Sequence, residues 1–365
     1  MKQGLIWLFV GIGCQDAKED LNYSDESNEG EESIEEEGSD TDDPDTDDEV
    51  VDEEEEIEIP ACPENVICAE SFPFQHTGDT SLSSKRDFDN YSCAPSTDES
   101  GAEVVYRFIL PHDGFLSLEL YDMESGADVD IHLLGSLNSA DCIDRGHWLA
   151  GSYLPAGEYW VVADSWVNAS GSEKPGVYSL QVGLTTEEDF IASGMEEEVA
   201  GDALHAFDIA WSNDELDSFV YSVTDFSLHS SEKRMWIYDL ASNSLLHNLH
   251  VAHGEGSSDP SDEGYASTFS NTPDSLQSSL GMMRAAESYT GSFGYSMRID
   301  GLESYNDKVR ERFIVFHGWE GSRPEYVNQF GMVAPTWGCP AVDDREVTDL
   351  VDILTDGSGM LFWYP

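Results

Sequence analysis

Two residues in the C-terminal half of the sequence have the side chains of a nucleophile and a general base. Cys339 is the only cysteine after residue 142 and lies on a Gly-Cys-Pro turn. His317 follows the apolar run 313–316, which predicts a buried strand ending at the histidine. A histidine at a strand end and a cysteine on a later turn can meet as base and nucleophile. We therefore take Cys339 and His317 as candidate catalytic residues.

The residues around Cys339 suit this chemistry. Gly338 allows close backbone approach to a ligand, and Pro340 fixes the turn after the cysteine. An amphipathic stretch follows at 343–355, and we expect Asp343 or Asp344 to cap it as a helix. A helix start near the cysteine would lower the pKa of its thiol, and backbone N–H groups at 338–339 would stabilise an oxyanion. The alternatives are an inert buried thiol and a histidine that only packs at a strand end.

The elements that must position these residues are mostly strands. Helical spacing appears at 204–211, and a strand follows at 218–226. Residues 234–240 and 244–254 read as a hairpin. Further strands are expected at 294–302 and 360–364, and residues 254–268 are expected to form a surface loop.

An earlier part of the chain shows short strands separated by turn signals. Alternating patterns occur at 104–110, 115–120, 128–134, 154–164 and 176–182. Strands at this spacing predict a β-sandwich. Asp128 and Asp130 either hold calcium at a strand edge or are the solvent-facing positions of a strand, and the sequence leaves both open.

Composition excludes one class of function. The 365 residues carry 75 acids against 16 bases, a formal net charge of −59. Binding to nucleic acid requires basic patches, so we exclude it. The acid excess continues past the N-terminal segment, which suggests a salty or calcium-containing medium that screens self-repulsion. Nine tryptophans, fifteen tyrosines and sixteen phenylalanines are enough to build real cores.

The N-terminus has the pattern of an export signal and a tether. Residues 1–13 combine a short basic start with an apolar run and resemble a bacterial lipoprotein signal that ends before Cys14. This resemblance implies acylation of Cys14 and a lipid anchor in the membrane, and the alternative is an ordinary signal peptide. Residues 14–60 are nearly all acidic or small polar residues, so we predict a disordered acidic linker. A cation-binding or partner-binding tail is the alternative.

The six cysteines fit an exported protein. If Cys14 is acylated and Cys339 is catalytic, four remain, and an even remainder predicts two disulfides. Four cysteines allow three pairings, of which we favour the local pair and the longer one: Cys62–Cys68 and Cys93–Cys142. Zinc is disfavoured because no Cys-x-x-Cys spacing occurs.

Two family resemblances cover most of the remaining chain. The linked motifs at 253–254, 269–271, 279–281, 317–318 and 338–341 resemble the murein L,D-transpeptidase catalytic domain family, from about residue 203 to the end. The sandwich region resembles the bacterial pre-peptidase C-terminal domain, a jelly-roll-like accessory module. The first resemblance implies that Cys339 attacks a peptidoglycan peptide stem at the carbonyl joining an L-centre to a D-residue, forming a thioester. An amine acceptor then makes a cross-link, whereas water makes the protein an L,D-carboxypeptidase.

Other residues are assigned to the substrate site. We place His253, Ser270, Asn271, Ser279 and Trp337 there as substrate-binding residues. For His253 three roles stay open: lining the site, orienting the catalytic pair, or capping the loop. The serines and Asn271 are expected to shape loops or contact substrate, not to act as nucleophiles. Arg298 and Arg345 either meet a stem carboxylate or form surface ion pairs.

The sequence departs from the broader transpeptidase pattern at two positions. Many members carry a histidine before the glycine and an arginine two residues after the cysteine. Trp337 and Ala341 occupy these positions here, which affects acceptor choice and the oxyanion contacts.

The sequence therefore predicts a mainly β, exported cell-envelope protein that is monomeric and needs no cofactor or metal. Its parts are the signal 1–13, the linker 14–60, the sandwich 61–186 and a mostly β catalytic domain with a few helices at 200–365. The predicted function is a cysteine-dependent L,D-transpeptidase acting on peptidoglycan stems. A non-catalytic wall-binding lipoprotein and a cysteine peptidase on protein substrates are the rival functions.

Overall fold

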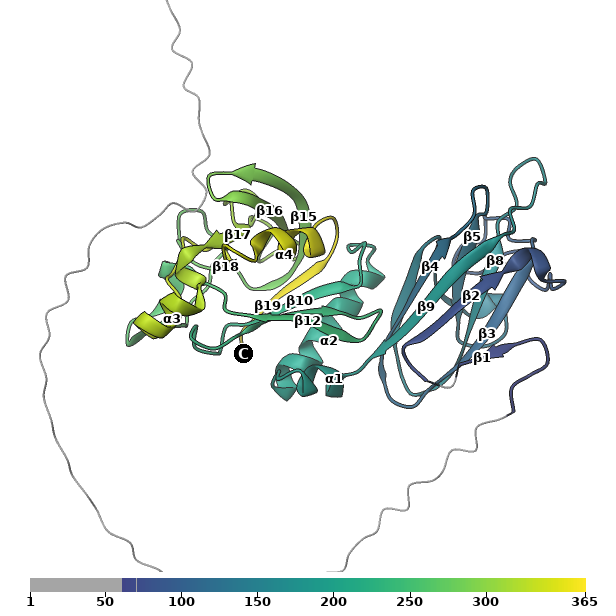
Figure 1. Ribbon diagram of the computed structural model, residues 1–365, viewed down its shortest axis with the longest axis horizontal. Coiled ribbons are helices and arrows are strands. Elements are labelled where there is room, and N and C mark those ends of the chain that lie inside the picture. The colour runs from purple at the N-terminus through teal and green to yellow at the C-terminus, as the bar shows by residue number, and fades with distance from the viewer. Residues whose placement is uncertain (1–60, 70) are drawn as a thin grey trace, which may run out of the picture. The chain divides into compact units, whose positions relative to one another are not determined.

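The computed structural model describes residues 61–69 and 71–365, and these are mostly β, as the sequence predicted (Figure 1). The predicted signal 1–13, the linker 14–60 and Cys14 lie outside the described residues. Within the described part, no helix is long and apolar enough to cross a membrane. The domain boundaries at 186 and 200 stay predictions.

The first part of the fold is a sandwich of two sheets (Figure 1). One sheet has the strand order β1-β3-β8-β5-β6 and the other β2-β9-β4-β7. The strands are β1 (Ile67–Cys68), β2 (Phe74–Asp79), β3 (Glu103–Leu110), β4 (Gly114–Asp122), β5 (Val129–Leu134), β6 (Cys142–Gly146), β7 (Leu149–Leu154), β8 (Gly157–Ser165) and β9 (Val177–Thr185). Apolar side chains from both sheets, such as Phe108, Leu118 and Val161, are fully buried between them. Each such side chain contributes about 1.5–3 kcal/mol by leaving water.

Both predicted disulfides are confirmed. Cys62 pairs with Cys68, and Cys93 pairs with Cys142. The second bond ties the segment before β3 to the start of β6, so it closes a loop around much of the sandwich.

The second part is built on an eight-stranded mixed sheet with the order β12-β11-β10-β19-β15-β16-β17-β18. Its strands are β10 (Val220–Asp225), β11 (Met235–Asp239), β12 (Ser244–Leu249), β15 (Gly281–Gly291), β16 (Gly294–Gly301), β17 (Val315–Trp319), β18 (Ala341–Asp343) and β19 (Gly359–Trp363). The described helices are α1 (Glu187–Ala192), α2 (Glu197–Ser212), α3 (Pro324–Phe330) and α4 (Val347–Leu354).

Two helices pack on different hydrophobic clusters of this sheet. Residues of α2 at positions 199, 203, 204 and 207 are buried at helical spacing, and they share a cluster with Leu361 of β19. Residues of α4 at positions 347, 350, 351 and 354 share the other cluster with Met360 and Cys339. Because neighbouring residues of a strand point to opposite faces, α2 and α4 cover opposite faces of β19. Cys339 therefore belongs to the α4 face.

The sandwich also contacts the second part. Phe115 of β4 packs edge-on against Phe207 of α2, with ring centroids 4.9 Å apart. The Ser117 hydroxyl of β4 donates to the Leu240 carbonyl over 3.1 Å. The described residues from 62 onward thus form one compact unit.

Several predicted elements differ in detail. His317 is the middle residue of β17, not its last, because the strand continues to Trp319. The expected loop at 254–268 contains a small hairpin, β13 (Ser258–Asp259) with β14 (Asp262–Ala266). The prediction that Asp343 or Asp344 caps a helix is wrong: Asp343 lies in β18, and α4 begins only at Val347. A strand thus separates Cys339 from the helix along the chain.

Candidate functional site

The two candidate catalytic residues are brought together by neighbouring strands: His317 lies on β17, and Cys339 lies just before β18. β17 pairs in parallel with β18, and His317 is the register partner of Ala341. Cys339 lies two residues before Ala341, and its Sγ accepts a hydrogen bond from the Val315 N–H over 3.4 Å. Val315 precedes His317 by two residues on the same strand, a rise of roughly 7 Å. The sulfur therefore lies against the backbone of the strand that carries the imidazole.

The surroundings of His317 fix which ring nitrogen is basic. Its side chain is buried, and Nδ1 lies 2.9 Å from the carbonyl oxygen of Gly318. A carbonyl only accepts, so Nδ1 carries the proton of the neutral ring and Nε2 holds the lone pair. Phe293, at the turn between β15 and β16, stacks on the imidazole with centroids 4.1 Å apart. The ring is thus oriented as a general base through Nε2.

Cys339 is fully buried in this structure. The residue before it, Gly338, has φ of +110°, and a Cβ there would lie 2.6 Å from the Gln277 carbonyl oxygen. Only glycine fits this position. The close backbone approach predicted for Gly338 is therefore made, in this structure, to the protein's own Gln277.

Thr336 holds the same turn and was missed by the sequence reasoning. Its Oγ1 accepts from the Gly338 N–H over 3.2 Å and donates to the Cys339 carbonyl over 2.7 Å. The Gly338 N–H is thus already bonded within the turn, which leaves the Cys339 N–H as the candidate donor to an oxyanion. The sequence does not show that a threonine hydroxyl both accepts and donates hydrogen bonds within a turn. The only indication is that Thr336 lies three residues before the cysteine.

His253 is a buried neutral ring behind the turn. Arg234, itself fully buried, donates from its NH2 group to Nδ1 of His253 over 2.8 Å. Because a guanidinium only donates, Nε2 carries the ring proton and donates to the Ser258 hydroxyl over 3.2 Å. Burial, and then the charge of Arg234, lower the pKa of His253 to about 3. The His253 carbonyl accepts from the Thr336 N–H, so this segment also supports the cysteine turn.

Comparison with known proteins identifies the second part of the fold. Residues 192–364 match the model of the L,D-transpeptidase catalytic domain family. These residues are similar to that family. The resemblance predicted from the motifs is confirmed, and we call this part the transpeptidase domain. Family members act on the peptide stems of peptidoglycan.

Solved structures resemble both parts of the chain. An L,D-transpeptidase from Mycobacterium smegmatis is 9% identical, covers 64% of this chain and 82% of its own length, and has a TM-score of 0.25. The L,D-transpeptidase LdtMt1 in complex with imipenem is 11% identical, covers 67% and 82%, and has a TM-score of 0.25. The pre-peptidase C-terminal domain of a Bacillus anthracis collagenase is 13% identical, covers 34% and 99%, and has a TM-score of 0.24. No protein with a curated description matches the sequence.

The loop at 270–279 in the transpeptidase domain is held by Arg312. Its guanidinium donates to the Ser270 carbonyl and Ser279 Oγ through one nitrogen, each over 2.5 Å. Through the other it donates to the Gln277 carbonyl over 2.5 Å and to Ser275 Oγ over 3.2 Å. Because Gln277 abuts Gly338, Arg312 braces the cysteine turn from outside. Sequence reasoning missed Arg312.

The remaining predicted residues have structural partners of their own. Asn271 bonds to Asp307 and to the Lys308 N–H, at the edge of the same loop. Trp337 is half-buried against the core that contains Cys339. Arg298 pairs with Glu287, and Arg345 pairs with Asp343 and Glu325. Substrate binding by His253, Ser270, Asn271, Ser279 and Trp337 stays a prediction.

The distribution of arginine partners sets the cysteine turn apart. Of the seven arginines after residue 200, five form ion pairs with carboxylates. Arg234 and Arg312 instead bind only carbonyl oxygens, hydroxyls and His253 among the described residues. Both lie behind loops that contact Gly338. The charge of Asp225 acts on Arg234, whereas the hydrogen bonds of Arg312 among the described residues go to carbonyl and hydroxyl oxygens.

Two groups of potential metal ligands occur among the described residues of the sandwich. Ligand atoms of Asp122, Asp128 and His147 lie within 4.8 Å of one another. Asp130 is not part of this group, because its carboxylate binds Arg145 and the His147 ring. Calcium binding at Asp128 stays a prediction. A second group, Cys93 and Cys142 with His132, has no thiolates to offer because the cysteines form a disulfide.

Proposed function

We propose that the transpeptidase domain is a cysteine-dependent peptidoglycan L,D-transpeptidase, with Cys339 as nucleophile and His317 as general base. The family match at 192–364 supports the reaction class. The observation that carries the residue assignment is the hydrogen bond from Val315, on the strand of His317, to Cys339 Sγ.

The first half-reaction forms a thioester. Nε2 of His317 takes the proton of the Cys339 thiol, and the thiolate attacks the stem carbonyl that joins an L-centre to a D-residue. The carbonyl oxygen becomes an oxyanion, for which the Cys339 N–H is the candidate donor. The C–N bond then breaks, and His317 gives its proton to the departing D-amino acid. The acyl group stays on sulfur.

The second half-reaction releases the acyl group from the sulfur. An amine of a second stem attacks the thioester carbonyl while Nε2 of His317 accepts the amine proton. The C–S bond breaks, the thiolate recovers the proton, and a new amide joins the two stems. Water in place of the amine would release a shortened stem, which is the carboxypeptidase side reaction.

We further propose that the protein works in the cell envelope, with residues 14–60 as a linker between a lipid-modified Cys14 and the sandwich. The export signature of residues 1–13 and the two sandwich disulfides support an oxidising location.

Incubation with purified muropeptides, followed by mass spectrometry, tests the function. We expect a covalent adduct on Cys339 whose mass equals the stem minus its D-amino acid, and a cross-linked product. Cys339→Ala should abolish both, and His317→Gln should slow adduct formation by roughly 10²–10⁴-fold.

Three other results would point elsewhere. Sacculus binding without turnover in wild-type protein would favour the wall-binding function. Shortened stems without cross-links would favour the carboxypeptidase. Cleavage of an unfolded protein substrate, with no preference for D-centres, would favour a peptidase.

A further inference from the structure

The hairpin of β15 and β16 carries one aromatic side chain to the imidazole of His317 (Figure 1). The two strands pair as far as Gly291 and Gly294, so Ser292 and Phe293 form the turn at the tip. Gly294 has a φ of +78°, and a two-residue turn followed by a left-handed glycine is a common way to close a hairpin. Phe293 is therefore placed by the geometry of the turn.

The contact between Phe293 and His317 is a stack of two ring faces. Their centroids are 4.1 Å apart, and their planes are inclined by 23°. The face of a phenyl ring is negative and attracts a cation that lies within about 6 Å of its centre. In the proposed reaction, the imidazole of His317 becomes a cation when it takes the proton of the Cys339 thiol. The stack therefore favours the form of His317 that the first step produces.

The stack does not compete with the hydrogen bonds of the imidazole. Nδ1 of His317 donates to the Gly318 carbonyl over 2.9 Å, and a carbonyl supplies a dipole and not a full charge. The two nitrogens of an imidazole bond in the plane of the ring, whereas Phe293 lies against its face. The phenyl ring thus acts on the charge of the imidazole while Nε2 stays available for proton transfer.

Contacts along the hairpin hold its tip in place. Tyr295, two residues after Phe293, donates a hydrogen bond from its hydroxyl to the Asp352 carboxylate of α4 over 2.7 Å. Across the hairpin, the guanidinium of Arg298 on β16 lies over the ring of Tyr289 on β15, 4.7 Å from its centre. The tip is therefore tied to α4 and braced between its own two strands.

The hairpin and the nucleophile rest on one hydrophobic cluster. Phe293 is partly buried and packs against the cluster that contains Cys339, as do both hairpin tyrosines. α4 contributes four buried residues to the same cluster. β16 also pairs with β17, where Met297 is opposite Phe316, the residue before His317. The ring of Phe293 is thus held relative to both reacting groups.

We propose that Phe293 is a positioning residue of the acyl-transfer reaction, whose ring face stabilises the imidazolium form of His317. This inference rests on the proposed function, because it assigns Phe293 a part in the proton transfer from Cys339 to His317. Phe293 acts through His317, and the anchored hairpin keeps the two rings stacked. Without the ring, less of the thiolate and imidazolium pair forms at neutral pH.

An NMR titration of the His317 ring protons in the full chain measures this effect without any substrate. Phe293→Leu keeps an apolar side chain over the imidazole but removes the ring, so it should lower the pKa of His317 by about 0.5–1. Phe293→Tyr restores the ring face and should bring the pKa back to the wild-type value. Tyr295→Phe releases the hairpin from Asp352, should lower the pKa by a smaller amount, and serves if Phe293→Leu fails to fold.

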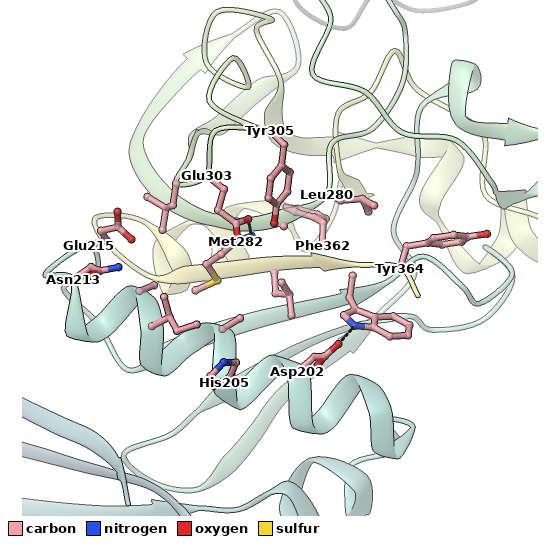
Figure 2. A pocket seen from close by; sticks show the side chains of 17 residues that line it. Asp202, His205, Asn213, Glu215, Leu280, Met282, Glu303, Tyr305, Phe362 and Tyr364 are labelled. Atoms are coloured by element: carbon pink, nitrogen blue, oxygen red, sulfur yellow. Dashed lines mark hydrogen bonds between the residues drawn. The ribbon is translucent and has the colours of Figure 1, made fainter.

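A control variant removes an aromatic ring elsewhere in the domain. Tyr305 lines a pocket of about 580 Å³ beside α2, and neither His317 nor Phe293 is among the residues that line it (Figure 2). Tyr305→Leu should therefore leave the pKa of His317 unchanged. An unchanged pKa in Phe293→Leu, or an equal fall in Phe293→Tyr or Tyr305→Leu, would overturn the proposal.

Kinetics with purified muropeptides separate positioning from substrate binding. Phe293→Leu should lower kcat for thioester formation at pH 7 by about three- to tenfold and leave KM within about twofold, because the ring acts on the proton transfer. A rise in KM with unchanged kcat would show that Phe293 binds substrate instead, and would overturn the proposal. Absence of thioester in the wild type would contradict the proposed function, whereas the titration of His317 would still decide whether Phe293 stabilises the imidazolium.

Discussion

Arg234 donates a hydrogen bond over 2.8 Å to Nδ1 of His253, and both side chains are almost wholly buried. This contact places a positive charge against an imidazole that is thereby kept neutral. His253 accepts a hydrogen bond from Arg234 and donates one to Ser258. These two bonds fix the neutral tautomer of His253 in which Nε2 carries the proton.

The first prediction concerns the pH dependence of stability. The native pKa of His253 is about 3, below the usual 6.5, so between these values the unfolded chain binds a proton that the native chain does not. Stability therefore falls as pH decreases, by up to about 1.4 kcal/mol per pH unit from this group. In His253→Gln, the loss of unfolding free energy between pH 7 and pH 5 should be smaller by about 2 kcal/mol.

Urea denaturation at the two pH values measures this difference. Glutamine keeps one acceptor for Arg234 and one donor for Ser258 but does not titrate. His247→Gln, on β12 away from the turn, is the control. An NMR titration in which the His253 ring protonates near pH 6.5 would contradict the prediction.

A second prediction separates the two reasons why residue 338 must be glycine, which are its positive φ and its close contact with Gln277. Gly338 has φ of +110° and would collide with Gln277 through a Cβ, whereas Gly331 has φ of +76° and open space around it. Gly331→Ala should cost roughly 1–2 kcal/mol of stability and leave acyl transfer intact. Gly338→Ala should also displace the turn and lower thioester formation on Cys339 by about 10²-fold or more, because small misplacements of reacting groups are costly. Equal activity in both variants, measured by adduct mass spectrometry, would count against this role.

The sequence predicted the elements whose pattern is regular. The sandwich strands alternate and end at turn residues, and each predicted segment there overlaps an observed strand, as β3 and β8 show. β15 was not predicted, although it spans Gly281–Gly291. Its register with β16 shifts between Ala285 and Ser288, and this irregularity breaks the alternation on which strand prediction depends.

The candidate site also contains residues that the sequence could indicate and residues that it could not. Cys339 and His317 could be chosen from residue type and spacing, and in the structure Cys339 lies two residues before β18, which pairs with the strand of His317. Arg234 and Arg312 could not be chosen from the sequence. Their acceptors are mainly backbone carbonyls of loops, and the sequence does not show which carbonyls an arginine will reach. The helix after Cys339 was misplaced because Asp343, read as a cap, instead binds Arg345 from the end of a strand.

A third prediction tests Arg312 as the brace of the 270–279 loop. Arg312→Met leaves the acceptors of a half-buried cation without a donor, so we expect a loss of about 3 kcal/mol in unfolding free energy. Arg298→Met removes an exposed ion pair with Glu287 and should cost less than about 1 kcal/mol. Because Gln277 abuts Gly338, Arg312→Met should also slow thioester formation, which Arg298→Met should not. Similar losses of stability from the two variants would refute the brace.

The last prediction compares the two sandwich disulfides, which close loops of very different length. The sequence separations are 49 residues for Cys93–Cys142 and 6 for Cys62–Cys68. By loop entropy alone, removing the long bond should cost about 4 kcal/mol and removing the short one about 2 kcal/mol. Paired serine variants, Cys93→Ser with Cys142→Ser and Cys62→Ser with Cys68→Ser, can be unfolded in urea without reductant. A larger loss for the short loop would show that strain or residual structure, not loop entropy, governs these bonds, whereas the expected order would identify Cys93–Cys142 as the main covalent support of the sandwich.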